Sequence, residues 1–245
     1  MSPVRGFVAA LLLLACAAAQ AAPDYAREKR WADEVVPGIV VGDAVFLELG
    51  SGRKFLALLT EPNEPRAALI VVHGLGIHPD WGLVGTLRTG LADRRYTTLS
   101  VQMPVLAATA APGEYRSTFP EAVERIARAV DYLGAKGYGK IAIVSHSMGS
   151  TMTREYLRKD PSRVFAWASL GNVERDAYSG LVIPLLDLFG ENDLPNVLGN
   201  APSRAASLAG NAKSRQLKIP ATDHFFKDRE AAMIEAVAAF LAALP

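Results

Sequence analysis

The sequence predicts an α/β fold, a doubly wound and mostly parallel sheet of about eight strands with helices on both faces. Two observations support this prediction. Continuous apolar runs of the length of buried strands alternate with segments whose apolar residues recur at helical spacing. Two β-like runs joined by Gly50-Ser51-Gly52 precede this alternation, so the sheet is expected to begin with a hairpin.

The individual elements follow from the same patterns. The charged segment from Asp24 to Val35 reads as a surface helix, with Trp31 as its one large apolar anchor. The hairpin strands are expected at 43–49 and 54–60, and buried strands at 67–72, 97–101, 141–144, 164–170 and 181–189, with a weaker one at 214–219. Helix-compatible residues 151–159 follow one strand, and three other helices are marked by the sets Leu83, Leu87 and Leu91; Ala122, Ile126, Val130 and Leu133; and Ile234, Val237 and Leu241.

The length of 245 residues suits one α/β domain preceded by a leader. Arg5, an apolar stretch from Phe7 to Ala15 and the small-x-small segment Ala19-Gln20-Ala21 resemble a secretory signal peptide cut after Ala21. The apolar stretch is too short to predict a transmembrane span in the mature chain. We therefore expect a signal peptide at 1–21, an N-terminal extension at 22–42 and the α/β domain at 43–245, in the periplasm or secreted.

Leu13-Leu14-Ala15-Cys16 provides a competing interpretation, because it resembles a bacterial lipobox with Cys16 as the lipid-bearing residue. Cys16 is the only cysteine, so cleavage after Ala21 leaves a mature chain without disulfides, zinc–thiolate sites or a cysteine nucleophile. Basic and acidic residues number 26 and 25, and no dense basic run occurs. This balance gives no support for nucleic-acid binding.

Ser145-His146-Ser147-Met148-Gly149 is the most informative segment for function. It lies between a predicted strand and a predicted helix, the context in which a nucleophile elbow presents a serine at the tip of a strained turn. The positions two before and two after the nucleophile must be small. Ser145 and Gly149 satisfy this, although glycine is usual at the first position. Ser147 is therefore the candidate nucleophile.

A serine nucleophile needs a base and a group that orients the base. His224 lies in a loop between the last strand and the last helix, beside Asp223, and is the candidate base. His146 is expected to pack or to line the pocket. For the acid, Asp193 follows a buried strand and gives the chain order Ser, Asp, His; Asp187 is expected to be structural, and Glu191, Glu174 and Asp176 are alternatives.

An oxyanion hole needs two backbone donors. We expect the Met148 N–H and the Leu75 N–H to supply them, with His73 bracing the loop that carries Leu75. Asp80 in that loop is expected to cap the next helix, and His78 and Trp81 are candidate substrate contacts. His73, His78 and Asp80 match no known zinc spacing, so neither a metal nor a cofactor is expected.

In combination, His73-Gly74-Leu75, the Ser145–Gly149 elbow, Gly190-Glu191-Asn192-Asp193 and Asp223-His224 resemble the α/β-hydrolase superfamily over about residues 43–245. Residues 76–81 and 98–104 look like a poorly characterised proteobacterial family of exported α/β-hydrolase-like proteins. The superfamily resemblance implies a serine hydrolase that uses Ser147, Asp193 and His224 without a cofactor.

Many superfamily members insert a cap domain after the strand that ends near Gly171, but too few residues follow here for one. An open site is therefore expected, walled by short loops such as 107–118, with Tyr178, Met148 and Phe225 as candidate lining. The leading functional hypothesis is hydrolysis of a small-molecule or lipid-like carboxylic ester or thioester. The alternative is a non-catalytic α/β-hydrolase-fold protein that binds envelope components or a protein partner, because fold alone does not fix function.

Overall fold

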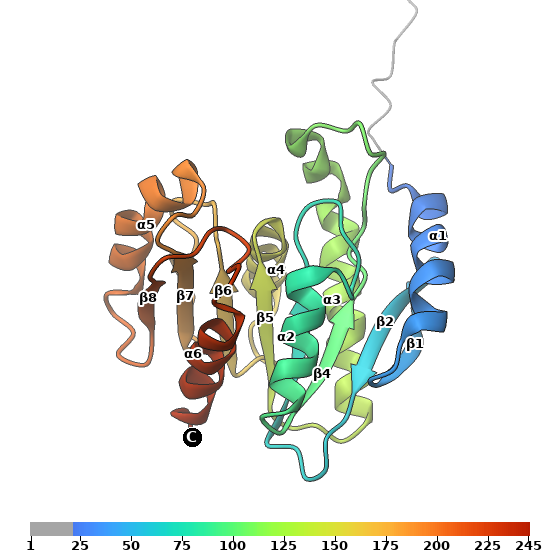
Figure 1. The fold of residues 1–245 in the computed structure, drawn as a ribbon, viewed down its shortest axis with the longest axis horizontal. Coiled ribbons are helices and arrows are strands. Elements are labelled where there is room, and N and C mark those ends of the chain that lie inside the picture. The colour runs from blue at the N-terminus through green and yellow to red at the C-terminus, as the bar shows by residue number, and fades with distance from the viewer. Residues whose placement is uncertain (1–21) are drawn as a thin grey trace, which may run out of the picture.

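The sheet has eight strands in the part of the chain that the computed structural model describes, residues 22–245. These strands are β1 (Asp43–Glu48), β2 (Lys54–Thr60), β3 (Ala67–Val72), β4 (Tyr96–Val101), β5 (Ile141–His146), β6 (Ala166–Leu170), β7 (Leu185–Gly190) and β8 (Arg215–Ile219). Their order across the sheet is β1-β2-β4-β3-β5-β6-β7-β8 (Figure 1). β2 pairs antiparallel with β1 and with β4, and every other pairing is parallel. The predicted leading hairpin and doubly wound sheet are therefore both present.

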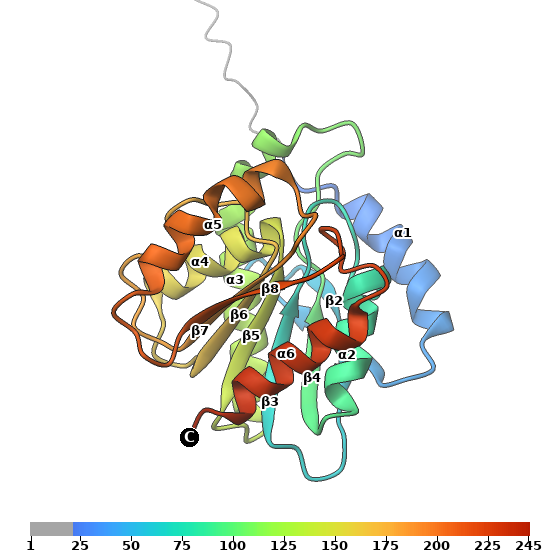
Figure 2. The ribbon, with the colours of Figure 1, turned by 60° about the vertical axis from the view of Figure 1, so that its left-hand side comes forward.

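Helices cover both faces of this sheet (Figures 1 and 2). The helical segments are α1 (Tyr25–Val35), η1 (Val36–Gly38), α2 (Gly82–Ala92), η2 (Pro112–Thr118), α3 (Phe119–Ala135), α4 (Met148–Lys159), α5 (Pro195–Leu208) and α6 (Glu230–Ala242). α2 and α6 pack together on one face, and α3 and α4 pack together on the other. The parallel strands and their crossover helices thus form a three-layer α/β architecture.

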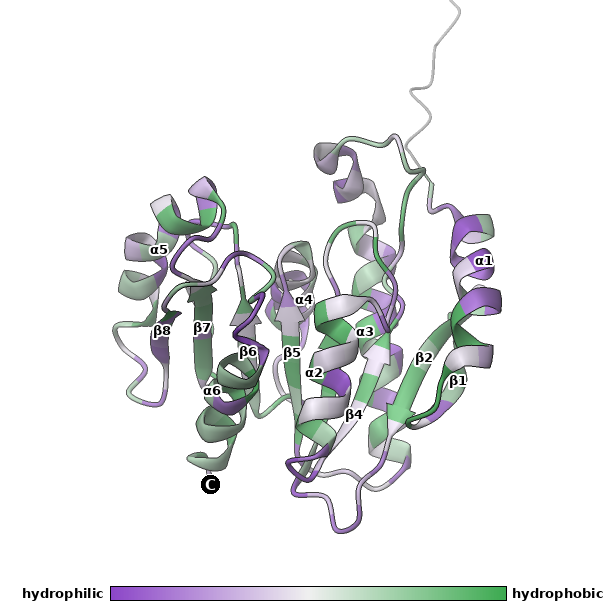
Figure 3. Cartoon of the chain, viewed as in Figure 1, coloured by the Kyte–Doolittle hydropathy of each residue, from purple (hydrophilic) through white to green (hydrophobic). Residues whose placement is uncertain are grey.

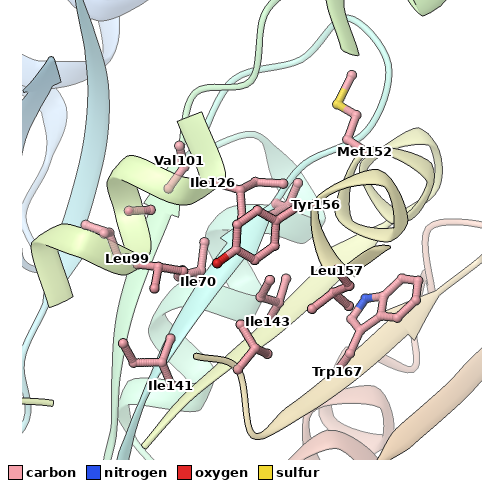
Figure 4. Close-up of a cluster of buried hydrophobic side chains, with 14 of the residues drawn as sticks. Ile70, Leu99, Val101, Ile126, Ile141, Ile143, Met152, Tyr156, Leu157 and Trp167 are labelled. Atoms are coloured by element: carbon pink, nitrogen blue, oxygen red, sulfur yellow. The ribbon is translucent and has the colours of Figure 1, made fainter. Parts of the chain in front are cut away.

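The central parallel strands are buried along their whole length because both of their faces are covered. Every residue of β3, β5, β6 and β7 is buried, and Figure 3 shows the central strands as hydrophobic. On the α3 and α4 face, Tyr156 and Leu157 of α4 meet Ile126 of α3 above Ile143 and Trp167 of the sheet (Figure 4). This packing fixes the position of α4, and with it the residue that precedes α4.

The N-terminal segment is fastened to the domain rather than loosely appended. Asp24 caps α1 by accepting a hydrogen bond from the Arg27 N–H at 2.9 Å. Glu28 on the next turn is buried and forms an ion pair of 2.9 Å with Arg125 of α3, whose side chain is fully buried. Removing one partner of such a pair leaves an uncompensated buried charge, which is strongly destabilising. The 22–42 segment is thus part of the packed structure.

Some expected elements differ from the observed ones. α5 was not predicted, because Pro195, Gly199 and Pro202 interrupt its sequence pattern; Pro195 instead occupies the first turn, where its missing N–H costs nothing. The segment 107–118, expected as a short loop, contains η2 over its second half. β7 begins at Leu185 and not at residue 181, because residues 181–184 belong to the connection from β6.

No cap domain interrupts the described fold, since residues 171–184 alone connect β6 to β7. None of the helices within residues 22–245 is long and apolar enough to span a bilayer. The expected signal peptide at 1–21 and the candidate lipid-bearing Cys16 lie outside the described residues.

Candidate active site

Ser147 occupies a sharp turn between β5 and α4. Its backbone has φ 55° and ψ −126°, a conformation that is strained for a residue with a side chain. The Ser147 N–H donates to the carbonyl of Leu170 at the end of β6, at 2.8 Å. A β-carbon at Gly149 would collide with the backbone carbonyls of Val72 and His73. Glycine is therefore required two residues after the serine, as the elbow pattern predicts.

The departure at Ser145 is accommodated by the core beneath the elbow. The Ser145 side chain is fully buried, and its Oγ accepts a hydrogen bond of 2.7 Å from the indole N–H of Trp167. The same Oγ lies 2.9 Å from the hydroxyl of Ser150 in the first turn of α4. The Ser145 hydroxyl is therefore satisfied by hydrogen bonds, and the strained turn at Ser147 forms without glycine at position 145.

His224 and Asp193 meet Ser147 above the carboxyl ends of the strands. The His224 Nε2 lies 2.9 Å from the Ser147 Oγ, and the His224 Nδ1 lies 2.6 Å from the Asp193 Oδ1. The Asp193 carboxylate is buried and also accepts the backbone N–H groups of Leu194 at 2.7 Å and Gly190 at 3.2 Å. The carboxylate orients the Nδ1–H of the imidazole, which leaves Nε2 free to accept the serine proton.

The loops that carry the acid and the base are joined directly to each other. The Asn192 N–H donates to the Thr222 carbonyl at 2.8 Å, and the Ala221 N–H donates to the Glu191 carboxylate at 2.9 Å. A β-carbon at Gly190 would collide with the backbone of Thr222, so this close approach needs glycine. These contacts hold the loops of Asp193 and His224 together, although the two residues lie 31 positions apart in the chain.

Two buried histidines support the site without belonging to the hydrogen-bonded relay. The His146 Nε2 donates to the His224 carbonyl at 2.8 Å, and burial holds the pKa of His146 down to about 4. The His73 Nδ1–H donates to the Gly74 carbonyl at 2.8 Å, and its Nε2 accepts the Met103 N–H at 2.9 Å. Burial lowers the pKa of His73 to about 3. Both rings are therefore neutral, in packing and bracing positions as expected.

The oxyanion candidates lie on either side of Ser147. Met148 is the first residue of α4, where backbone N–H groups lack helical partners. A β-carbon at Gly74 would lie 3.0 Å from the Ser147 β-carbon, so the Gly74-Leu75 backbone passes directly beside the nucleophile. Gly76, which follows, has φ +67° and turns the loop away.

The other acidic candidates do not contact the imidazole of His224. Asp187 is fully buried and pairs with the equally buried Arg204 at 2.9 Å, and it accepts the Tyr178 hydroxyl at 2.7 Å. Tyr178 therefore belongs to the core, not to the pocket lining. Glu174 lies 3.8 Å from Arg154, and Asp176 is exposed. Asp223 accepts the backbone N–H of Phe225 at 2.9 Å, a local turn contact.

The prediction that Asp80 caps α2 was wrong. The helix begins after Trp81, with no side-chain cap, and Asp80 instead pairs with the buried Arg88 at 2.7 Å. His78 packs against Trp31 of α1, with the ring centroids 5.7 Å apart. No group of His, Cys, Asp and Glu side chains within the described residues has an arrangement suited to a metal ion.

Four large apolar side chains around the serine are partly exposed. Leu75, Trp81, Leu194 and Phe225 expose 38%, 37%, 43% and 43% of their surface, and Trp81 meets the edge of Phe225 at 5.4 Å. Leu75 follows Gly74, Leu194 follows Asp193 and Phe225 follows His224 in the chain. Trp81 reaches the site through its contact with Phe225. These four residues are called the apolar rim below.

Comparisons with solved structures establish the fold. The chain is similar to dienelactone hydrolase from Anabaena variabilis, at 19% identity and a TM-score of 0.67, over 82% of this chain and 96% of that one. It is similar to the ferulic-acid complex of Est1E from Butyrivibrio proteoclasticus, at 16% identity and a TM-score of 0.68, over 82% and 99%. A member of the α/β serine hydrolases without a lid, from Xanthomonas campestris, matches at 15% identity and 0.66, over 84% and 97%.

The protein therefore has the α/β-hydrolase fold without a cap domain. A family model described as "Protein of unknown function (DUF3530)" matches residues 41–124. This range ends within α3 and includes the loop with Leu75, but not Ser147, Asp193 or His224. A search of the curated proteins found no match.

Proposed function

We propose that the protein is a serine hydrolase that cleaves carboxylic esters or thioesters through an acyl-enzyme on Ser147. One observation carries the proposal: the Asp193–His224–Ser147 relay, with distances of 2.6 and 2.9 Å, at a serine held in a strained elbow. A buried carboxylate, a neutral imidazole acceptor and a hydroxyl in this order are what activation of a serine requires.

In the proposed reaction, the His224 Nε2 takes the proton of the Ser147 hydroxyl while Oγ forms a bond to the substrate carbonyl carbon. The carbonyl oxygen becomes an oxyanion. The Met148 N–H at the start of α4 and the Leu75 N–H in the loop after β3 stabilise it. The tetrahedral adduct collapses, and His224 gives the proton to the departing alcohol or thiol. Water then attacks the acyl-enzyme by the same route, releasing a carboxylic acid and restoring Ser147.

The apolar rim supports a lipid-like or aromatic ester as substrate. Partly exposed apolar side chains next to a reacting serine gain free energy when an apolar substrate group covers them, at about 25 cal/mol per Å². Phe225 and Trp81, which contact each other, provide aromatic surface, and Leu75 and Leu194 provide aliphatic surface. Two similar solved structures support the proposal, since one is a serine hydrolase without a lid and the other is Est1E with ferulic acid bound.

Export is part of the proposal. Residues 1–21 have the pattern of a signal peptide, which would place residues 22–245 in the periplasm or outside the cell. Mass spectrometry of the mature N-terminus tests this directly. A chain that begins at residue 22 supports cleavage after Ala21, whereas a lipid-modified Cys16 supports the lipoprotein alternative.

Labelling with a fluorophosphonate tests the proposed nucleophile. The folded protein should label at Ser147 and hydrolyse p-nitrophenyl esters, and Ser147→Ala should abolish both. Asp193→Asn should lower kcat by about 10⁴-fold, because the amide no longer holds the imidazole in the tautomer whose Nε2 accepts the serine proton. Ser179→Ala changes an exposed serine and serves as the matched control. A folded wild type that labels no better than Ser147→Ala would favour the alternative, a non-catalytic binding protein.

A further inference from the structure

A groove of about 900 Å³ lies between α1 and the β1–β2 hairpin, away from the serine. One wall is formed by α1 and η1, and the other by β1, β2 and the turn between them. We call it the helix–hairpin groove. Its volume falls in the range of small-molecule sites, roughly 300–1,000 Å³. α1 runs alongside β1 and β2 in Figure 1.

The helix–hairpin groove is distinct from the candidate active site. None of Ser147, Asp193 and His224 lines it. Gln102, which follows β4, forms part of its wall and on its other side contacts the Nε2 of His73 at 3.1 Å. Gln102 therefore lines the groove and also contacts His73, the residue that braces the loop with Leu75.

The groove has an apolar lining that suits a hydrocarbon or aromatic body. Phe55 and Leu56 of β2 form its floor but expose only 3% of their surface each, whereas the partly exposed Val36 and Ala32 line the opposite wall. Phe46 on the edge strand β1 exposes 54% of its surface, although it is a large aromatic residue. Partly exposed apolar surface in a concave site marks it as a place where a ligand gains free energy by burial.

The charges around the groove favour an anion. Glu28 shares the buried Arg125 with Glu121, at 2.9 and 2.5 Å, and Asp33 pairs with Lys29 at 2.7 Å. Arg53 in the hairpin turn is exposed, and within the described residues it has no carboxylate within 4 Å. Its guanidinium stacks on the Tyr25 ring at 3.5 Å, which holds the fork in a defined place. A preorganised arginine of this kind suits a carboxylate or phosphate group.

Gln102 adds a requirement for a hydrogen-bond donor. Its Nε2 donates to the Met103 carbonyl at 2.7 Å and faces the His73 Nε2, so the amide orientation is fixed by acceptors. Its Oε1 is buried and accepts no hydrogen bond from any described residue. A buried acceptor without a partner is costly, and an N–H or O–H from a ligand would satisfy it.

We propose that the helix–hairpin groove is a binding site for an amphiphilic anion: an acyl chain, an adjacent amide N–H or hydroxyl, and a carboxylate or phosphate head. In this arrangement the chain lies along Phe46, Val36 and Ala32, the donor meets the Gln102 Oε1, and the head meets Arg53. An N-acyl amino acid has all three parts. The site does not depend on the proposed hydrolase activity.

Calorimetric titration of the full chain with N-dodecanoylglycine, below its critical micelle concentration, tests the proposal. We expect one saturable site that persists after Ser147 is blocked with a fluorophosphonate. Arg53→Gln should weaken binding by about tenfold or more, the factor that corresponds to roughly 1.4 kcal/mol. Ala32→Trp should fill the groove and abolish binding. N-dodecanoylsarcosine lacks the N–H and should bind several times more weakly.

Arg215→Gln is the matched control, because Arg215 also stacks on an aromatic ring, Phe240 at 5.6 Å, on the opposite edge strand β8. It should leave the affinity unchanged. The proposal is overturned by an absence of saturable binding, by equal affinities of the Arg53→Gln and Arg215→Gln variants, or by loss of binding when Ser147 is blocked. Equal binding of dodecyltrimethylammonium would also overturn it, because the groove would then not select an anion.

Discussion

The backbone of Gly171 lies directly against the ring of His224. A β-carbon at position 171 would approach the His224 Cε1 to 2.9 Å and Nδ1 to 3.0 Å. Gly171 is the first residue after β6 and has φ +57°, and its N–H donates to the Leu188 carbonyl at 2.8 Å. Only glycine at position 171 therefore leaves room for the His224 ring at the end of β6.

Gly171→Ala should displace the His224 ring and lower kcat/KM for a p-nitrophenyl ester. A displacement of about 1 Å in a reacting group can cost about a hundredfold in rate. Gly180→Ala is the matched control, because Gly180 also has positive φ, +80°, but a β-carbon there meets no atom within 4 Å. Both substitutions introduce the same kind of backbone strain. Only Gly171→Ala should therefore lower the activity per folded molecule. Equal losses in the two variants would show that strain, and not the ring contact, is responsible.

Ser145→Ala should destabilise the fold while leaving the turnover of folded molecules nearly unchanged. The substitution leaves the buried Trp167 indole N–H without its acceptor, which costs about 1–3 kcal/mol. Urea unfolding monitored by tryptophan fluorescence measures the loss. In a Trp167→Phe background the donor is already absent, so the same serine substitution should cost clearly less. Additive losses in this double-mutant cycle would argue against the hydrogen bond as the cause.

Much of the fold was predictable because the parallel strands are buried on both faces. β3 and the first four residues of β5 therefore appear as uninterrupted apolar runs, and the helices between them keep one apolar face. The positions of Ser147, Asp193 and His224 after strand ends were predictable for the same reason. α5 was missed because its two prolines and its glycine obscure the helical pattern.

The parts of the site that the sequence did not predict depend on contacts between distant segments. Nothing local to Gly171 indicates that it faces His224, because the two meet only when β6 and the loop after β8 are in place. The pairing of Glu28 with Arg125 likewise joins a surface helix to α3. Asp80 precedes an apolar helical pattern, which is typical of a helix cap. Its carboxylate instead pairs with the buried Arg88, a contact that the local sequence does not reveal.

The stability of the protein should fall as the pH is lowered from 7 to 5. His146 is buried, and its pKa lies at about 4, below the ordinary value of 6.5 for an unfolded chain. Between these values the unfolded state binds the proton and the folded state does not, so stability is lost as the pH falls below about 6.5. At pH 5 the loss from one such histidine is about 2 kcal/mol. His73, with a pKa of about 3, acts in the same direction.

Urea unfolding at pH 7, 6 and 5 measures this dependence. His146→Gln keeps a side-chain N–H for the His224 carbonyl but removes the titrating group. It should remove at most about half of the decrease in unfolding free energy between pH 7 and 5, since His73 remains and burial also lowers the pKa of His78. A pH dependence as steep as that of the wild type would exclude His146 as a source.

Arg27 on α1 should act as a positioning residue for the oxyanion loop. Its guanidinium donates to the Leu106 carbonyl at 2.8 Å and to the Gly76 carbonyl at 3.2 Å, and it stacks on Trp31 at 4.4 Å. Gly76 immediately follows Leu75, so loss of this contact frees the backbone that carries the proposed donor. The donor acts on the oxyanion and not on the bound ester, so the loss should appear in kcat more than in KM.

Arg27→Ala should therefore lower kcat by about tenfold, which corresponds to about 1.4 kcal/mol of transition-state stabilisation. Arg30→Ala removes an exposed arginine from the same helix and should leave kcat unchanged. Steady-state kinetics with a p-nitrophenyl ester separates kcat from KM, and thermal unfolding of both variants accounts for any loss of α1 packing. If Arg27→Ala lowers the unfolding temperature but leaves kcat intact, α1 only stabilises the fold and the oxyanion loop holds its position without it.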